Sequence, residues 1–256
     1  MLAINLTNAM MVVVLGMAVG VSSCAQESKP VTKAEVEQLV KEYILKNPEV
    51  IIDSVRQYQE RAQAAEKKRT LEAVSTRQEE LLRDPASPAS KPFEKTGGKV
   101  TIVEFFDYRC GYCKKVRPTV AKLLADNANV RMVFKEFPIL GPESTVAAKA
   151  ALAAEKQGKY VPFHQAMMAA TDVSENGVEK VAKEVGLDVA KMKADMQSPA
   201  IAAALEKNMQ LAQAMGVTAT PTFVVGSEVV AGAIDAKSFQ NLIAKAQPKQ
   251  SEPAKP

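Results

Sequence analysis

Two cysteines, Cys110 and Cys113, stand three positions apart between an expected buried strand and an expected helix. The strand is the apolar run over 100–106, and the helix is expected over 114–127. The first turn of a helix presents unpaired backbone N–H groups and the positive end of the helix dipole. Both favour a thiolate on Cys110, so the sequence predicts a redox-active dithiol at this point of the fold.

Cysteine pairs with this spacing also bind zinc or carry covalently attached haem. Zinc needs about four ligands, and the other candidates are only His164 and Cys24. Haem attachment requires a histidine directly after the second cysteine, where this chain has Lys114. Thiol–disulfide exchange is left, with Cys110 as the exposed nucleophile and Cys113 as the resolving thiol. We therefore expect neither a metal nor another cofactor, and we interpret His164 as a core or surface histidine.

Composition excludes several other classes of protein. The chain has 256 residues, 47% of them hydrophobic, which is enough for a genuine core and argues against disorder throughout. Three cysteines cannot form a scaffold of several structural bridges. The net charge of +4 is small and its signs are interspersed, so the sequence does not indicate a nucleic-acid surface.

The N-terminal 25 residues have the character of a secretory signal. Residues 9–21 are apolar and end in small residues, a segment too short to span a membrane. Two processing routes fit. Cleavage before Cys24 would leave a lipidated cysteine and a membrane anchor, whereas ordinary cleavage after Ala25 would remove it. Either route predicts export to an oxidising compartment.

Residues 26–83 are expected to be helical. A capping box at Thr32 and Glu35 starts the first helix, and no Pro or Gly interrupts the stretch 49–84. Apolar positions there step by three and four residues, which is typical of a seam between helices, at Ile51, Val55, Tyr58, Ala62 and Ala65. These helices either fold back onto their own domain or join copies of the chain. We favour self-association as a homodimer, with a trimer as the alternative.

A linker over 84–98, rich in turn formers, precedes an expected catalytic domain over 99–247. That domain begins with a βαβ unit whose second strand covers 130–137. An Ala-rich helical insertion follows over 142–215, then a hairpin of strands 222–225 and 229–231, and a closing helix over 236–246. Residues 248–256 have the composition of a disordered tail.

The dipeptide Thr220-Pro221 immediately precedes the hairpin. In thioredoxin-like folds a proline at this place is cis and packs against the dithiol, and the X–Pro bond is the one that tolerates the cis form. The loop would offer backbone groups to a substrate. An ordinary turn before an edge strand is the alternative interpretation.

Glu104 is an acid inside an otherwise apolar strand. A buried carboxylate is costly unless it is paired or useful. One hypothesis is that Glu104 relays a proton to or from Cys113, with Lys135 on the neighbouring strand as its partner. The other is that strand alternation carries Glu104 to solvent.

Three stretches, 104–113, 135–142 and 220–223, resemble the DsbA family of bacterial disulfide oxidoreductases, and specifically its Com1/ScsC-like branch. The resemblance covers about 84–246, and the helical region before it is similar to the oligomerising extensions of that branch. It implies an α/β, thioredoxin-like fold with a helical insertion, preceded by an all-helical oligomerisation region. It further implies a periplasmic location, with Cys110, Cys113 and Pro221 as site residues and Glu104 as the family's buried acid.

At two positions this chain differs from the strongest oxidases of the family, and both bear on whether it oxidises, isomerises or reduces disulfides. The strongest oxidases carry Pro-His between their cysteines, whereas this chain carries Gly111 and Tyr112, which predicts a milder oxidant. Thr220 before the proline resembles isomerases and reductases. We expect disulfide isomerase and oxidase activity, with Thr220 and Tyr112 contacting the substrate. A dedicated reductant and a chaperone-like binding module are the alternatives.

The expected partners follow from the same resemblance. They are unfolded or misoxidised exported proteins, a membrane redox partner of DsbB or DsbD type, and further copies of the chain.

Overall fold

The computed structural model describes residues 30–90 and 100–247. Its helices are α1 Lys33–Lys46, α2 Glu49–Thr76, α3 Gln78–Leu82, α4 Gly111–Asp126, α5 Pro142–Glu155, α6 Tyr160–Ala169, α7 Glu175–Glu184, α8 Val189–Met196, α9 Pro199–Ala214 and α10 Ala236–Ala246. Its strands are β1 Val100–Phe106, β2 Val130–Glu136, β3 Thr222–Val225 and β4 Glu228–Ala231. The expected signal with Cys24, residues 91–98 of the expected linker and the expected tail lie outside the described residues.

The chain divides into two compact units, and the boundary between them lies inside α2, between Gln57 and Tyr58. In the first unit, the predicted capping box begins α1: the Thr32 hydroxyl accepts the Glu35 N–H at 3.3 Å, and the Glu35 carboxylate accepts the Thr32 N–H at 2.9 Å. None of the α1 residues is buried. Large apolar side chains of this unit are exposed, namely Val36, Leu39, Val40, Tyr43, Leu45, Val50, Ile51, Ile52 and Val55.

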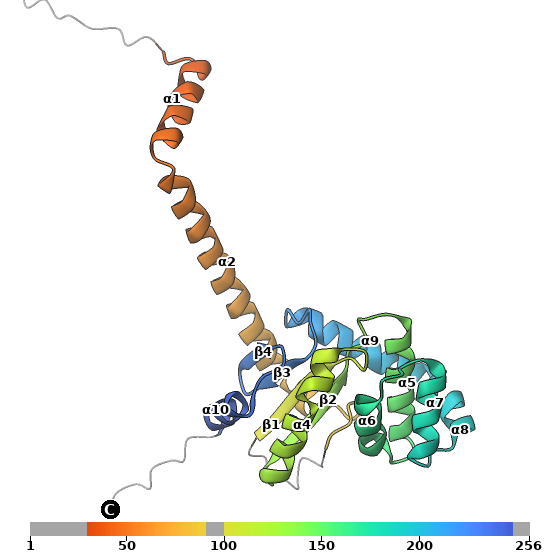
Figure 1. The fold of residues 1–256 in the computed structure, drawn as a ribbon. Coiled ribbons are helices and arrows are strands. Elements are labelled where there is room, and N and C mark those ends of the chain that lie inside the picture. The colour runs from red at the N-terminus through yellow and green to blue at the C-terminus, as the bar shows by residue number, and fades with distance from the viewer. Residues whose placement is uncertain (1–29, 91–99, 248–256) are drawn as a thin grey trace, which may run out of the picture. The chain divides into compact units, whose positions relative to one another are not determined.

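The second unit is built on a sheet with the strand order β2-β1-β3-β4 (Figure 1). β1 and β2 are parallel, and α4 is the crossover between them. β3 and β4 form the predicted hairpin and continue the sheet in antiparallel pairing. Helices α5 to α9 lie between β2 and β3 in the chain, which confirms a thioredoxin-like fold with a helical insertion.

Alternate residues of β1 serve the two faces of this sheet. Ile102 and Phe106 pack in one cluster with buried residues of α4, of α10 and of the insertion. Val103 and Phe105 pack in another, on the opposite face. Each face therefore has its own apolar core, and the fold buries the sheet on both sides.

The second face is covered partly by residues that the sequence assigns to a separate helical region. Val74 of α2 is 3% exposed and Leu81 of α3 is 1% exposed. Both belong to the cluster that includes Val103, Phe105 and Leu211 of α9. The later part of α2 and all of α3 thus belong to the unit that carries the dithiol, which begins at Tyr58 instead of the expected residue 99.

The described part of the expected linker also joins this unit. Ala89 forms an antiparallel bridge with Val133, on the edge of β2 that β1 does not use. The Ser90 N–H donates to the Met132 carbonyl, and the Phe134 N–H donates to the Pro88 carbonyl, each at 2.9 Å. Residues 88–90 therefore cover one edge of the sheet. Within the described residues, no helix is both long and apolar enough to cross a bilayer.

Candidate active site

Cys110 is the N-cap residue of α4, directly after the loop that follows β1. Its sulfur accepts the backbone N–H of Cys113 at 3.4 Å. This is the position in which a side chain satisfies one of the unpaired donors of the first helical turn. The sulfur of Cys110 therefore lies at the positive end of the helix dipole, as the sequence predicts.

The loop before β3 reaches the same sulfur. The Thr220–Pro221 peptide bond is cis, and the Pro221 side chain is buried. The Cys110 thiol donates to the Thr220 carbonyl oxygen at 3.2 Å. Residues 110 positions apart in the sequence therefore meet at one point, where a polypeptide bound to the loop would also contact the sulfur.

The two sulfurs differ less in exposure than we expected. Cys110 is 6% exposed, so the prediction of an exposed nucleophile is wrong, because the loop with Thr220 packs against its side chain. Cys113 is 1% exposed and lies one turn inward. Tyr112 between them is 65% exposed and is free to contact a substrate.

Burial raises the pKa of the Cys113 thiol well above its usual range, and the nearby Glu104 carboxylate and Cys110 raise it further. A thiolate at this position is therefore unfavourable unless a proton follows. Whatever disulfide Cys113 leaves, its sulfur requires a nearby proton source.

Glu104 of β1 lies near the Cys113 sulfur. Its side chain is 4% exposed, so the hypothesis of a solvated residue is wrong. Burial raises its pKa to about 8, and when it is ionised its charge raises the pKa of Cys113. Glu104 therefore holds a proton under neutral conditions, within electrostatic reach of the buried sulfur.

Lys135 is not the partner of Glu104. On β2, Lys135 pairs in register with Phe105, and it shares the face of Val133, which belongs to the cluster opposite α4. Its ammonium donates to the Glu80 carbonyl at 2.6 Å and to the Ser87 hydroxyl at 2.7 Å, and it pairs with Asp84 at 3.6 Å. The prediction placed both residues on adjacent strands correctly but missed that they face opposite sides.

The raised pKa of Glu104 predicts that stability falls as the pH rises. Between its ordinary value of 4.5 and about 8, the native state keeps a proton that the unfolded chain has released. The free energy of unfolding should therefore fall by up to about 1.4 kcal/mol per pH unit across this window. Glu104→Gln should flatten this slope, which is measured by urea unfolding at a series of pH values.

The matched control for this measurement is Glu184→Gln, because Glu184 is exposed on α7. It should keep the wild-type slope. The same proteins test the proton relay, since Glu104→Gln should alter the rate and pH profile of thiol exchange while Glu184→Gln does not. Equal slopes in both variants would contradict the burial argument, and unchanged exchange would contradict the relay.

Asp107 organises the approach to the dithiol, and sequence reasoning gave it no role. It directly follows β1, and its carboxylate accepts the N–H groups of Arg109, Ile139 and Leu140 at 2.7, 2.9 and 3.0 Å. The Ser144 hydroxyl donates to it at 2.8 Å. A carboxylate with four donors fixes the loop before Cys110 to the start of the insertion. An acid at the end of a buried strand was the available signal.

A buried polar network lies behind this loop. The Glu136 carboxylate accepts the hydroxyls of Tyr160 at 2.8 Å and Tyr108 at 3.1 Å, and Tyr108 also meets Nδ1 of His164 at 3.1 Å. Burial lowers the pKa of His164 to about 3, so its ring is neutral. This confirms the interpretation of His164 as a core histidine. The network ties β2 to α6 of the insertion.

Comparison with protein families agrees with this geometry. The model of the DSBA-like thioredoxin domain matches residues 101–244. The model of the N-terminal domain of the copper resistance protein ScsC matches residues 33–65. The first match lies within the second unit, and the second covers α1 and the first part of α2, which confirms the resemblance to the ScsC-like branch.

Two solved structures are similar to this chain. A thioredoxin-like oxidoreductase from Silicibacter pomeroyi is 40% identical, with a TM-score of 0.62 over 66% of this chain and 96% of its own. BcfH from Salmonella enterica Typhimurium is 30% identical, with a TM-score of 0.68 over 83% and 95% of the two chains.

Curated relatives divide into two groups. Disulfide bond formation protein D of Bacillus subtilis is 29% identical over 59% of this chain and 74% of the relative. The chain also matches Na(+)/H(+) antiporters NhaA, of which it spans about a fifth of the length. By its domain match, its relatives and the arrangement of Cys110 and Cys113 beside the Thr220–Pro221 loop, the chain belongs to the DsbA-like thioredoxin family of thiol:disulfide oxidoreductases.

Proposed function

We propose that the protein is a periplasmic thiol:disulfide interchange protein that isomerises and forms disulfide bonds in exported proteins. The observation that carries the proposal is the contact between the Cys110 sulfur and the Thr220 carbonyl, beside a buried Cys113. A disulfide exchange site needs a nucleophilic sulfur next to a surface that holds the client's chain, and a second sulfur beside it that can form a disulfide with the first.

In the oxidative direction, a client thiolate attacks Cys110 of the Cys110–Cys113 disulfide. A bond forms between the client sulfur and Cys110, and the electron pair of the broken bond leaves with Cys113. Glu104 supplies the proton that this buried sulfur needs. A second client thiolate then attacks the mixed disulfide, which makes the client's disulfide and releases Cys110 as a thiolate, with the dithiol reduced.

Isomerisation starts from the reduced protein. The Cys110 thiolate attacks a wrong disulfide of the client, and the freed client thiolate later attacks a different client sulfur. A client thiolate finally attacks the client sulfur of the mixed disulfide, which forms the correct client bond and releases Cys110 as a thiolate, so no net electrons are transferred. The Gly111-Tyr112 pair between the cysteines, in place of Pro-His, supports a milder oxidant that can work in this way.

We further propose that the first helical unit joins copies of the chain, with a dimer favoured over a trimer. A solvent-exposed apolar face on a helix with no buried residue is unfavourable in a monomer. Val36, Val40 and Tyr43 follow one another by four and three positions, and each is about half exposed. Pairing with a second copy would bury this face and place two dithiols around one client.

Polar substitution of this face should separate the two activities. We expect the combined change Val36→Ser, Val40→Ser and Tyr43→Ser to reduce the mass found by light scattering to that of one chain. Reactivation of scrambled ribonuclease should fall by about tenfold, because one dithiol then acts alone, while oxidation of reduced ribonuclease is retained.

The control carries three substitutions on the opposite side of the same helix, Ala34→Ser, Glu37→Ser and Lys41→Ser, which lower helix propensity at least as much. It should keep the wild-type mass and both activities. An unchanged mass in the apolar-face variant would contradict self-association through α1, and lost oxidation would contradict the separation of roles.

A further inference from the structure

The two edges of the sheet differ. Residues 88–90 cover the edge of β2, whereas no described residue pairs with the outer edge of β4. The Gly232 N–H donates to the Pro221 carbonyl at 2.7 Å. This bond shows which opposing residues of β3 and β4 are hydrogen-bonded to each other. Because bonded and non-bonded pairs alternate, Val229 and Ala231 turn their backbone N–H and C=O groups outward. These four groups form a short template for another strand.

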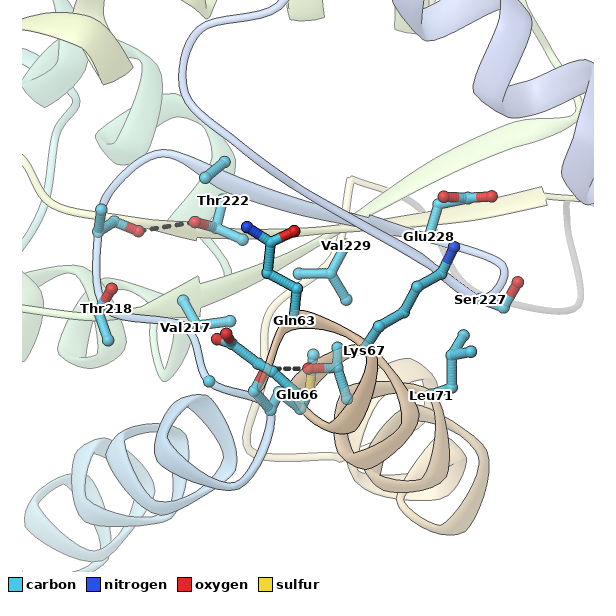
Figure 2. Close-up of a pocket in the computed structure, with 15 residues that line it drawn as sticks. Gln63, Glu66, Lys67, Leu71, Val217, Thr218, Thr222, Ser227, Glu228 and Val229 are labelled. Atoms are coloured by element: carbon cyan, nitrogen blue, oxygen red, sulfur yellow. Dashed lines mark hydrogen bonds between the residues drawn. The ribbon is translucent and has the colours of Figure 1, made fainter. Parts of the chain in front are cut away.

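A groove of about 580 Å³ lies between α2 and this hairpin. Val229 and Ala231 line it from the strand, and Leu71 lines it from α2. Figure 2 shows Gln63 and Lys67 extending from α2 toward the hairpin, and polar side chains such as Glu228 line the groove together with the apolar ones. Such a mixed lining offers both apolar contact and hydrogen-bond partners to a bound polypeptide.

One loop links the groove to the dithiol. Thr218 and Thr222 line it, and Thr220 between them contacts the Cys110 sulfur. The Thr70 hydroxyl of α2 donates to the Met215 carbonyl at 3.2 Å and so fixes the start of the loop. From β1 to a strand added outside β4 there are three spacings, or about 14 Å. About four residues of extended chain cover that distance.

We propose that this groove binds an extended segment of the client polypeptide as an added strand on β4, while a cysteine about four residues away in the client reacts at Cys110. The inference rests on the proposed function and names how that site holds its substrate. Main-chain hydrogen bonds to Val229 and Ala231 would be independent of client sequence, which suits an enzyme that acts on many unfolded proteins. The occupant is an unfolded polypeptide and not a second folded copy.

The test uses the full chain with Cys113→Ala and Cys24→Ser, so that Cys110 alone reacts. The probes are peptides with one cysteine activated as a pyridyl disulfide. The Cys110 thiolate displaces the pyridine thiolate and forms a stable mixed disulfide. One peptide extends about two residues beyond its cysteine and the others about six, toward either end. Amide hydrogen exchange of the hairpin is measured by NMR for each adduct.

We expect one of the long peptides to slow exchange of the Val229 and Ala231 amides by about tenfold or more, and the short peptide to leave them unchanged. The Val230 amide already faces β3 and serves as an internal control. Gln63→Trp should fill the groove and remove this protection without changing the reaction with the short peptide. Lys68→Trp, on α2 but outside the groove, should not.

The outcomes separate the two proposals. If mixed disulfides form and neither long peptide protects the two amides, the groove is not a client site and the proposed function stands. If these amides are already protected in the protein without peptide, the chain or another copy covers the edge, which also overturns the inference. If no mixed disulfide forms at Cys110, the proposed function itself fails.

Discussion

Cys110→Ser is expected to reduce thiol–disulfide exchange by at least about a thousandfold, because removal of an attacking nucleophile leaves only the residual effect of binding. A serine hydroxyl can still cap α4 and contact the Thr220 carbonyl, so the fold should be retained. It cannot form a disulfide with a client or with Cys113. The measurement is the rate of reactivation of scrambled ribonuclease, together with oxidation of a dithiol peptide.

The companion variant Cys113→Ser gives a different defect. Cys110 can still attack a client disulfide, but the resolving sulfur is missing, so mixed disulfides with clients should accumulate and be visible on non-reducing gels. If ribonuclease reactivation survives Cys110→Ser, the dithiol is incidental and a chaperone-like binding module explains the protein better. If mixed disulfides accumulate on both variants, the assignment of the nucleophile is wrong.

The features that could be predicted from sequence depend on short-range patterns. β1 and α10 have the bounds that were expected, and the hairpin falls where the sequence predicts it. The dithiol loop follows from the order of strand, cysteine pair and helix. Each of these elements is specified by residues within about ten positions of one another, which is the range over which periodicity and turn signals operate.

The contacts that were missed depend on which element covers which face of the sheet. The alternation of apolar and polar residues in β1 and β2 is weak, because this sheet is buried on both sides, so nothing local indicated that Glu104 and Lys135 face opposite ways. Likewise, Val74 and Leu81 are among the few apolar residues of a mostly polar stretch. Their burial depends on the exposed second face of the sheet, which appears only when the whole fold is assembled.

The relay hypothesis changes accordingly. Glu104 keeps its place beside Cys113, but without a lysine to lower its pKa, and burial instead raises the pKa to about 8. A carboxyl group with this pKa can both donate and accept a proton near neutral pH, which suits a sulfur that alternates between thiol and disulfide. The unpaired arrangement therefore fits a proton relay better than the ion pair that was expected.

Lys135 instead stabilises the opposite face of the sheet. Removal of the carboxylate that pairs with it should lower the stability of the fold. The Lys135 side chain is fully buried, and its ammonium pairs with Asp84. Burial lowers the pKa of Lys135 to about 8, and the Asp84 carboxylate opposes this shift. We expect Asp84→Ala to lower the free energy of unfolding by about 3–5 kcal/mol, because it leaves a buried ammonium without its carboxylate. Urea unfolding at neutral pH measures this change.

The double variant Lys135→Met with Asp84→Asn tests the cause of that loss. Because it removes both buried charges and keeps similar volumes, it should be much closer to the wild type in stability than Asp84→Ala. Lys135→Met should also leave the pH profile of exchange at Cys110 unchanged, since Lys135 lies across the sheet from Cys113. A shifted profile in Lys135→Met would restore the pairing with Glu104, and a double variant as unstable as Asp84→Ala would contradict the unpaired-charge argument.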